Sequence, residues 1–420
     1  MKRGRAVLAG LLVAVAAGVA AAEEPLPLHG FVQTASAYRL VRPRACPPTQ
    51  RLACDESFVL GEGRARLEVD PRGERWGLVA KGELILDAVG GEVEGDLREG
   101  YLDLRFPALD LRVGRQVITW GVGDLIFITD VFPKDWVAFI SGLPLEYLKK
   151  GSDAVSATGH WARTSLQLVL IPRFEPDTLP EAGGRLRFHD PMAAIEARRT
   201  DEPSPALERT EAGARLFRNL LGWDVSLYAY RGFFHAPAGE VESGPRLRLF
   251  FPRLDVYGAS AQGAALGGVV SFEAGYYDSR SDRSGRMAAV ENSSVRLLAG
   301  YQRELVPDLT ASGQYSVQVM QGHDAYMRAR GPGMAKRAAA RHVLTLRLTQ
   351  LLLHQTLRLG VFALASPNEG DWYLGPEARY QITDALSATL GINAFGGPRR
   401  AEYGQFEGNS NLFAVVRYAF

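Results

Sequence analysis

The stretch HVLTLRLTQLLLHQTLRLGVFALA, residues 342–365, contains two alternating runs joined by a short connection. Leucine occupies positions 344, 346 and 348 of the first run, and Thr345 and Arg347 stand between the leucines. The second run places apolar residues at 357, 359, 361 and 363, with Arg358 on the opposite face. A period of two residues predicts β-strands with one apolar face. Arginine in the middle of the other face indicates that this second face meets water.

The same alternation recurs along nearly the whole chain, and helical periodicity is scarce. In GRARLEVD, residues 63–70, Ala65, Leu67 and Val69 alternate with charged side chains. The pattern predicts eighteen strands, with sixteen as the alternative. The predicted strands cover residues 28–40, 57–70, 76–89, 97–106, 109–119, 152–163, 165–173, 209–219, 222–233, 246–257, 266–278, 293–304, 309–320, 340–350, 355–365, 372–382, 385–396 and 411–420.

The connections between these strands alternate in length. One set consists of tight turns, whereas the other includes long segments at 41–56, 121–151 and 174–208, together with a shorter one at 90–96. Short turns at one end and long loops at the other are typical of bacterial outer-membrane barrels. Because lipid cannot satisfy backbone hydrogen bonds, such a sheet must close on itself. We therefore predict an all-β fold, a transmembrane antiparallel up-and-down barrel with long extracellular loops.

The N-terminus predicts export. Lys2, Arg3 and Arg5 precede an apolar run that ends in an A-x-A pattern at Ala20 and Ala22. This arrangement predicts a cleaved signal peptide over residues 1–22, with the barrel formed by residues 23–420. An uncleaved N-terminal membrane anchor is the alternative, although the run is short for a membrane span.

Two cysteines, Cys46 and Cys54, are the only ones in the chain. A pair in an exported protein predicts a local disulfide, and two thiols without nearby histidine cannot complete a zinc site. The formal net charge of the chain is +1, so there is no basic field that would suggest nucleic acid. Composition therefore gives no reason to expect a metal, a cofactor or a nucleic-acid partner.

The C-terminus NLFAVVRYAF ends in Phe420, with Tyr418 two residues before it. These two residues resemble the C-terminal strand signal of Gram-negative outer-membrane proteins, which the barrel assembly machinery reads. The segments LRVGRQVITWG and GQFEGNSNLFAVVRYAF are similar to segments of poorly characterised porin-like barrel families. The acidic constriction-loop motif of the well-known trimeric porins is not found.

The resemblance implies a porin-like barrel in the outer membrane of a Gram-negative bacterium. It implies contact with outer-membrane lipid and lipopolysaccharide, handling by the barrel assembly machinery, and small polar solutes as cargo. It leaves the oligomeric state open.

Many charges fall on the face opposite the aliphatic rows. At mid-bilayer an arginine facing lipid would cost about 2–4 kcal/mol, so we place these charges in a wet interior. They either form a salt-bridge mesh that stiffens the wall or guide solutes through a pore. Arginine outnumbers the acids, which favours polar or anionic solutes. The arginines are Arg64, Arg66, Arg105, Arg112, Arg215, Arg296, Arg347, Arg358, Arg379 and Arg417, and the acids are Glu68, Asp70, Glu83, Asp87, Asp103, Asp110, Glu211 and Glu377.

The segment GDLIFITDVFPKDW, residues 123–136, is too apolar for an exposed loop. We expect it to fold back inside the barrel, narrow the pore and begin a short helix near Pro133. Arg115 shares the parity of Val113 and would face lipid under strict alternation. We expect a β-bulge to turn it inward.

The predicted function is a channel for diffusion of small polar, including anionic, solutes, gated or narrowed by the inward segment. The candidate selectivity residues are Arg105, Arg112, Arg115, Asp130, Lys134, Asp135, Arg358 and Arg379. An assembly or export component is the rival function. An outer-membrane enzyme is the third candidate, but the seven histidines form no metal-binding motif and no nucleophile elbow occurs.

Overall fold

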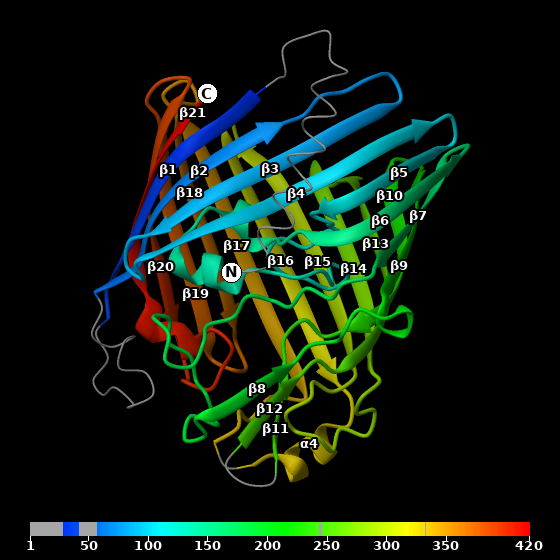
Figure 1. Cartoon of the computed structure of the whole chain (residues 1–420), viewed down its shortest axis with the longest axis vertical. Coiled ribbons are helices and arrows are strands. Elements are labelled where there is room, and N and C mark those ends of the chain that lie inside the picture. The colour runs from blue at the N-terminus through cyan, green and yellow to red at the C-terminus, as the bar shows by residue number, and fades with distance from the viewer. Residues whose placement is uncertain (1–27, 42–56, 243–245, 332) are drawn as a thin grey trace.

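The computed structural model describes residues 28–41, 57–242, 246–331 and 333–420, and eighteen strands close into one barrel (Figure 1). The predicted all-β antiparallel barrel is thus confirmed. Its strands are β1 Leu28–Arg39, β2 Phe58–Val69, β3 Trp76–Asp87, β4 Glu92–Phe106, β5 Leu109–Gln116, β6 Ser152–Trp161, β7 Thr164–Ile171, β9 Glu211–Leu220, β10 Trp223–Phe233, β13 Arg253–Ala265, β14 Gly268–Ser279, β15 Ser294–Val306, β16 Leu309–Met320, β17 Ala340–Leu352, β18 Leu357–Ser366, β19 Asp371–Gln381, β20 Leu386–Gly396 and β21 Asn411–Ala419.

The barrel closes between its first and last strands. β1 pairs with β21 in a continuous antiparallel register that runs from Phe31 opposite Ala419 to Arg39 opposite Asn411. Beyond β21, Gly30 and Phe420 exchange two backbone hydrogen bonds of 3.0 Å. Every other barrel strand pairs with its neighbours in the chain order, so no strand edge is left open to lipid. Phe420 therefore takes part in closing the ring, while its role as an assembly signal stays a prediction.

Side chains alternate between an apolar exterior and a mixed interior. On β1, Val32 is 52% exposed, whereas its neighbour Gln33 is 1% exposed. The same contrast occurs on β17, where Leu344 and Leu346 are exposed and Thr345 between them is buried. The leucine face of the strands thus points outward, as the alternation predicted. No helix within the described residues is long and apolar enough to cross a membrane.

The connections separate the barrel into a short-turn end and a long-loop end. At the short-turn end, the pairs Leu221–Gly222 and Leu266–Gly267 have positive φ at both positions. This is the conformation of a type I′ turn, whose twist matches the twist of the strands that it joins. Both chain ends of the barrel, at β1 and β21, also lie there. The predicted alternation of short and long connections is therefore correct in its main pattern.

Several predicted strand limits were wrong. The predicted strand 246–257 is two strands, β12 (Arg246–Phe250) and the start of β13, because Pro252 between them has no amide hydrogen to donate. β13 extends beyond the predicted limit at residue 257 and ends at Ala265, so the turn to β14 begins at Leu266. The expected connection over residues 90–96 is also too long, since β4 begins at Glu92 and pairs with β3.

A small second sheet lies beyond the barrel. β8 (Ala197–Asp201) runs parallel to β12, and β11 (Ala238–Val241) pairs with the other edge of β12. Figure 1 shows this sheet and helix α4 (His323–Ala329) at the long-loop end, opposite the C-terminus. The predicted signal peptide, residues 1–22, and the predicted Cys46–Cys54 disulfide both lie outside the described residues.

Candidate functional site

Residues 121–151, called here the inward loop, connect β5 to β6 through the interior of the barrel. Glu273 on β14 fixes the beginning of this loop. One carboxylate oxygen accepts hydrogen bonds from the backbone amides of Val122 (2.9 Å) and Gly123 (3.1 Å). The other oxygen accepts from the amide (2.7 Å) and the hydroxyl (2.6 Å) of Thr129. One buried carboxylate thus holds eight residues of loop in a closed turn against the wall.

Further anchors lie on the next strands of the same wall. The amide of Asp124 donates to Oε1 of Gln314 on β16 at 3.0 Å. The Asp124 carboxylate accepts two hydrogen bonds from Arg347 on β17, at 2.5 and 2.8 Å. The hydroxyl of Tyr277 on β14 donates to the carbonyl of Ile128 at 2.6 Å. The first part of the loop is therefore fixed to three different strands.

The last part of the loop is fixed to β2 and β21. Glu146, in the short 3-10 helix η2 (Leu145–Leu148), pairs with Arg417 at 2.6 Å and with Arg66 at 3.1 Å. Burial alone would raise the pKa of Glu146, but the two arginines outweigh it and hold the pKa below its usual value. Arg66 also donates to the hydroxyl of Tyr147 at 3.0 Å. Burial, reinforced by Glu83, raises the pKa of Tyr147 to about 12, so its phenol stays neutral.

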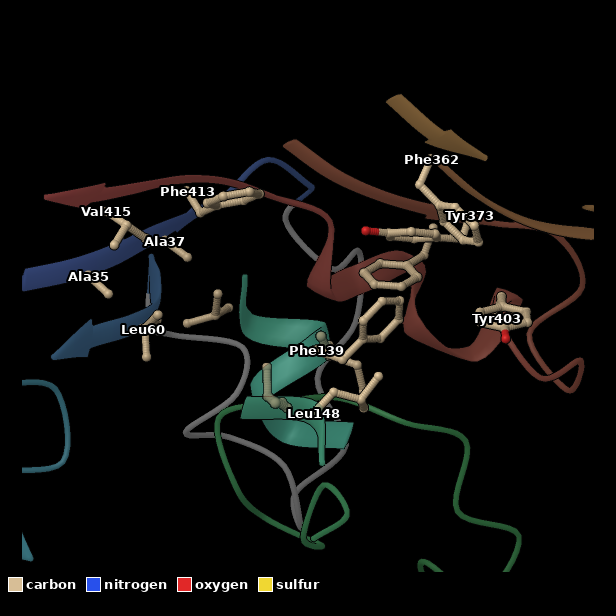
Figure 2. Close-up of a cluster of buried hydrophobic side chains, with 14 of the residues drawn as sticks. Ala35, Ala37, Leu60, Phe139, Leu148, Phe362, Tyr373, Tyr403, Phe413 and Val415 are labelled. Atoms are coloured by element: carbon tan, nitrogen blue, oxygen red, sulfur yellow. The ribbon is translucent and has the colours of Figure 1, made fainter. Parts of the chain in front are cut away.

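A short helix, α3 (Trp136–Ser141), joins these two anchored parts. The side chain of Asp135 caps it by accepting from the amide of Ala138 at 2.8 Å, and Gly142 ends it with φ 89°. Figure 2 shows Phe139 pointing from the helix toward Tyr373 of β19. Their ring centroids lie 5.0 Å apart. The predicted inward fold and the predicted short helix of this apolar segment are both confirmed.

A cavity of about 300 Å³ lies between the inward loop and the wall formed by β17, β18, β19, β20 and β21. The loop contributes apolar side chains and Glu146 to its lining, while the wall contributes most of the charge. The charged residues around it are Arg347, Arg358, Arg379, Arg417, Glu146 and Glu377. Four arginines against two glutamates make this space positive.

Arg358 and Arg379 are the unusual members of this wall. They lie directly opposite each other on β18 and β19. Arg347 and Arg417 are each paired with an acid of the inward loop. In contrast, Arg358, Arg379 and Glu377 form no ion pair with any residue that the structure describes, and Nε of Arg358 has no hydrogen-bond acceptor. Two uncompensated guanidinium groups beside a cavity are a candidate anion site.

Two further predicted residues lie away from the cavity. Arg112 on β5 donates to both oxygens of Asp103, at 2.7 and 3.2 Å, and lies over the ring of Tyr101. Arg105 is exposed at the short-turn end, opposite Asp110. Neither lines the cavity. Arg112 thus agrees with the interpretation that the inward charges form salt bridges with one another along the wall.

The acidic and basic candidates within the inward loop mostly satisfy one another. Nζ of Lys134 lies 2.9 Å from Asp130, and the two side chains are 5% and 4% exposed. Lys149 pairs with the other oxygen of Asp130 at 2.8 Å. Asp135 is the cap of α3, and its burial raises the pKa of the carboxyl. None of Asp130, Lys134 and Asp135 lines the cavity, so they stabilise the loop's own shape.

The β-bulge predicted at Arg115 is absent. Both ladders of β5 run without a register shift, and Arg115 lies opposite Gly100 and Asp153. By the alternation of the strand it therefore shares a face with Val113, and it lies one residue before the end of β5. Its guanidinium contacts Asp153 at 3.4 Å and Glu175 at 3.5 Å. Because these acids compensate its charge at the rim, no bulge is needed to move it inward.

The second long connection, residues 174–208, contacts distant parts of the long-loop end. The amide of Lys134 donates to the carboxylate of Asp177 at 2.7 Å. Further along, Arg185 pairs with Asp87 at the end of β3, and the amide of Arg187 donates to Asn409 at 2.8 Å. This segment therefore reaches from β7 across to β3 and to the connection before β21.

The acids that fix the inward loop were not among the residues predicted from the sequence. Glu273 and Glu146 are its main acidic anchors, yet neither was among the candidates. Glu273 stands in a predicted strand between Phe272 and Ala274, and a lone acid on an inward face is the signal that could have marked it. Arg347 and Arg417 were assigned correctly to the interior, but their acidic partners lie more than two hundred residues away.

No family model and no curated protein matches this chain. Solved structures do match it. OccK2 (OpdF) of Pseudomonas aeruginosa, solved in complex with glucuronate, has a TM-score of 0.57 and 11% identity, over 94% of this chain and 96% of that one. The outer membrane protein OpdK of the same organism has a TM-score of 0.55 and 10% identity, over 94% and 98%. OccAB3 of Acinetobacter baumannii has a TM-score of 0.54 and 9% identity, over 94% and 98%.

The chain has the fold of a porin-like outer-membrane barrel. At these identities the likeness concerns the fold, which extends over nearly the full length of both partners in each comparison. The closed sheet and the apolar exterior of this porin-like barrel place it across the bacterial outer membrane.

Proposed function

We propose that the barrel is a diffusion channel for small polar solutes, narrowed by the inward loop and selective for anions. The observation that carries the proposal is the positive cavity between the loop and the wall, with Arg358 and Arg379 lining it without acidic partners. Transport of this kind requires no covalent chemistry. The channel acts through its width and its charge.

The charge favours anions for a simple electrostatic reason. A guanidinium group holds a carboxylate or a phosphate with two parallel hydrogen bonds. Two such groups side by side attract an anion more strongly than either alone, and Glu377, the acid that lines the cavity beside them, offsets only one of the two charges. Binding in a channel must also be weak enough to release the solute. Water in the lumen screens the arginines and keeps the site weak.

The size of the cavity suits small solutes. Sites that enclose small molecules have volumes of about 300–1,000 Å³, and this cavity is at the lower limit. The glucuronate bound to OccK2 is a small solute with one carboxylate. A sugar acid of that kind would offer its carboxylate to Arg358 and Arg379 and its hydroxyls to the polar wall.

The inward loop would set the width of the passage. Glu273 and Arg347 fix one part of it, while Arg66 and Arg417 hold Glu146 in the other. A segment tied to opposite parts of the wall cannot move as a unit without breaking several charged contacts. We therefore expect a narrow and steady pore, rather than one that opens widely.

Planar-bilayer recording of the purified chain tests this function. Wild-type protein is compared with a variant in which residues 123–149 are replaced by a short glycine–serine linker. We expect small, steady conductance steps from wild type and clearly larger steps from the variant. In liposomes, a monocarboxylate sugar should enter faster than an amino sugar of the same size. Absence of conductance from both proteins, or equal entry of the two sugars, would contradict the proposal.

A further inference from the structure

The outer surface of the barrel carries a second charged site, which is separate from the cavity in the lumen. It is a notch of about 110 Å³ at the long-loop end, lined by Arg231, Arg253 and Arg280 together with Glu208 and Thr210. Arg231 lies near the end of β10, Arg253 begins β13, and Arg280 directly follows β14. Three neighbouring strands thus bring one arginine each to the same place.

The register of these strands arranges the site in rows. Arg253 lies opposite Phe233, and its carbonyl accepts a hydrogen bond from the amide of Arg280 at 3.0 Å. Two residues further along β13, away from the long-loop end, Asp255 lies between Arg231 and Asp278 in register. The next row along the strand places Tyr257 beside Tyr276. From the long-loop end along the strands, the rows therefore contain first arginine, then a mixture of acidic and basic side chains, and then tyrosine.

These rows face outward, toward lipid. Tyr257 is 54% exposed, and its neighbour Val256 is 1% exposed and belongs to an interior cluster. Arg253 and Asp255 share the parity of Tyr257, and Arg231 is paired with Asp255 in register. Tyrosine on the outer face is typical of the interface between hydrocarbon and head groups. Arg253 stands four residues beyond it, about 13 Å along the strand, which is the level of the lipid head groups.

The charges of the site do not cancel. Asp255 is shared by Arg231 (3.3 Å) and Arg280 (3.5 Å), and Asp278 pairs with Arg283 at 2.6 Å. Arg253 is exposed, and its guanidinium forms no ion pair or hydrogen bond with any described residue, while its backbone amide donates to the Ser281 hydroxyl at 2.9 Å. Glu208 at the border of the notch offsets one charge only. The site remains positive, with one arginine free to bind.

We propose that this notch binds a phosphate group of the phosphorylated glycolipid that forms the outer leaflet, lipopolysaccharide. Long loops mark the extracellular end of such barrels, so the notch lies on the outer-leaflet side. Basic pockets at head-group depth bind anionic lipids, and arginine holds phosphate with paired hydrogen bonds. Arg253 contacts the phosphate directly, and Arg231 and Arg280 contribute from the flanks while they share Asp255. The solute cavity plays no part in this site, since its lining comes from other strands.

Lipid binding to the detergent-solubilised full chain tests the proposal by native mass spectrometry. The probes are bis-phosphorylated lipid A and the same lipid after removal of both phosphates. The variants are Arg253→Ser and Arg253→Ser combined with Arg280→Ser. Arg303→Ser is the matched control, because Arg303 is also an exposed arginine, near the turn at Gly267 on the short-turn end. Heat-dependent migration on gels verifies that each variant is folded.

We expect Arg253→Ser to lower the affinity for phosphorylated lipid A by roughly tenfold, and the double variant by more. The control should bind as wild type does, and dephosphorylated lipid A should bind all four proteins equally weakly. Equal affinity of wild type and double variant for phosphorylated lipid A would overturn the proposal. Millimolar inorganic phosphate should displace the lipid only weakly. Complete displacement would assign the notch to a free anion and would also overturn the lipid assignment.

Discussion

Arg358 on β18 and Arg379 on β19 lie directly opposite each other, on the inner face of the barrel and without an acidic partner. Like charges in directly opposed positions of a sheet destabilise it. The other arginines of the same wall, Arg347 and Arg417, are compensated by Asp124 and Glu146. The uncompensated pair of Arg358 and Arg379 therefore lowers the stability of the barrel. Such a cost is expected at a site where the two charges are needed to bind a ligand.

Replacing one member of this pair should stabilise the barrel. We expect Arg379→Gln to raise the free energy of unfolding by about 0.2–1 kcal/mol, because it removes the repulsion from Arg358. The same variant should reduce entry of anionic solutes. Urea unfolding in lipid vesicles measures the first effect, and liposome uptake measures the second.

Arg112→Gln is the matched comparison. Arg112 is also an inward arginine, but it is paired with both oxygens of Asp103. Its replacement should leave the free energy of unfolding unchanged or lower it, by up to about 1 kcal/mol. If Arg379→Gln and Arg112→Gln changed stability in the same direction and by the same amount, the repulsion between Arg358 and Arg379 would not be the cause.

Glu273 should act as the principal fixed point of the inward loop. Its carboxylate accepts four hydrogen bonds from Val122, Gly123 and Thr129. Glu273→Ala leaves these buried donors without an acceptor, at a cost of about 1–3 kcal/mol for each unpaired group. The loop should detach, and single-channel currents should become larger and noisier.

Glu304→Ala serves as the control for this variant. Glu304 lies on the adjacent strand β15 near the short-turn end and makes no hydrogen bond to the inward loop. Its replacement should leave mean current and current noise as in wild type. Unchanged currents in Glu273→Ala would contradict the assignment of Glu273 as the anchor.

Acid should release the other fixed part of the loop. The pKa of Glu146 is lower in the folded protein than its usual value of 4.5, after Arg417 and Arg66 outweigh the effect of burial. A carboxyl with a depressed pKa stabilises the fold fully above the unfolded value. That contribution is lost as the pH falls through the depressed pKa. Conductance should therefore be constant from pH 7 to about 5 and increase below about 4.

Glu146→Gln separates this effect from other acid transitions. The amide cannot titrate, and it forms a weaker contact with Arg417 and Arg66 than the carboxylate does. Its conductance should be raised at neutral pH and should change little on acidification. A wild-type-like acid transition in this variant would show that another group is responsible.

Gly142 tests how tightly α3 is held against β21. It has φ 89°, and a Cβ atom there would meet the Phe413 side chain at 2.8 Å. Gly142→Ala should cost about 1–3 kcal/mol of stability from backbone strain, with a further loss from the contact. Gly91→Ala isolates the strain, because Gly91 has φ 71° and open space around it. Equal losses in urea unfolding for the two variants would rule out a tight contact at Phe413.

Much of the fold was predictable because β-strands in a barrel repeat every two residues. Leu344 and Thr345 took the expected outer and inner faces, and the same rule placed Arg347, Arg358, Arg379 and Arg417 inside. Periodicity cannot locate a turn within an apolar or mixed stretch, as the strand predicted at 246–257 demonstrates. There, the missing amide of Pro252 ended one strand and the next continued further than its composition suggested.

The candidate site was less predictable, since alternation assigns a face but not a partner. The charges of Asp130 and Lys134 predict a role in selectivity, and the sequence pattern does not show that the two side chains pair with each other inside the loop. Strict alternation predicts a bulge at Arg115, because it would otherwise face lipid, and no local pattern shows that Glu175, sixty residues away, helps to compensate its charge. Contacts of this kind depend on where a long loop returns to the wall, and no local pattern encodes that.

The reversal potential of single channels in a tenfold salt gradient tests most directly whether Arg358 and Arg379 select anions. Wild type is compared with Arg358→Glu combined with Arg379→Glu, a double change that reverses the charge of the uncompensated pair. We expect an anion-selective potential for wild type and a shift toward the cation side for the variant. Identical reversal potentials for the two proteins would contradict the claim that this arginine pair selects the solute.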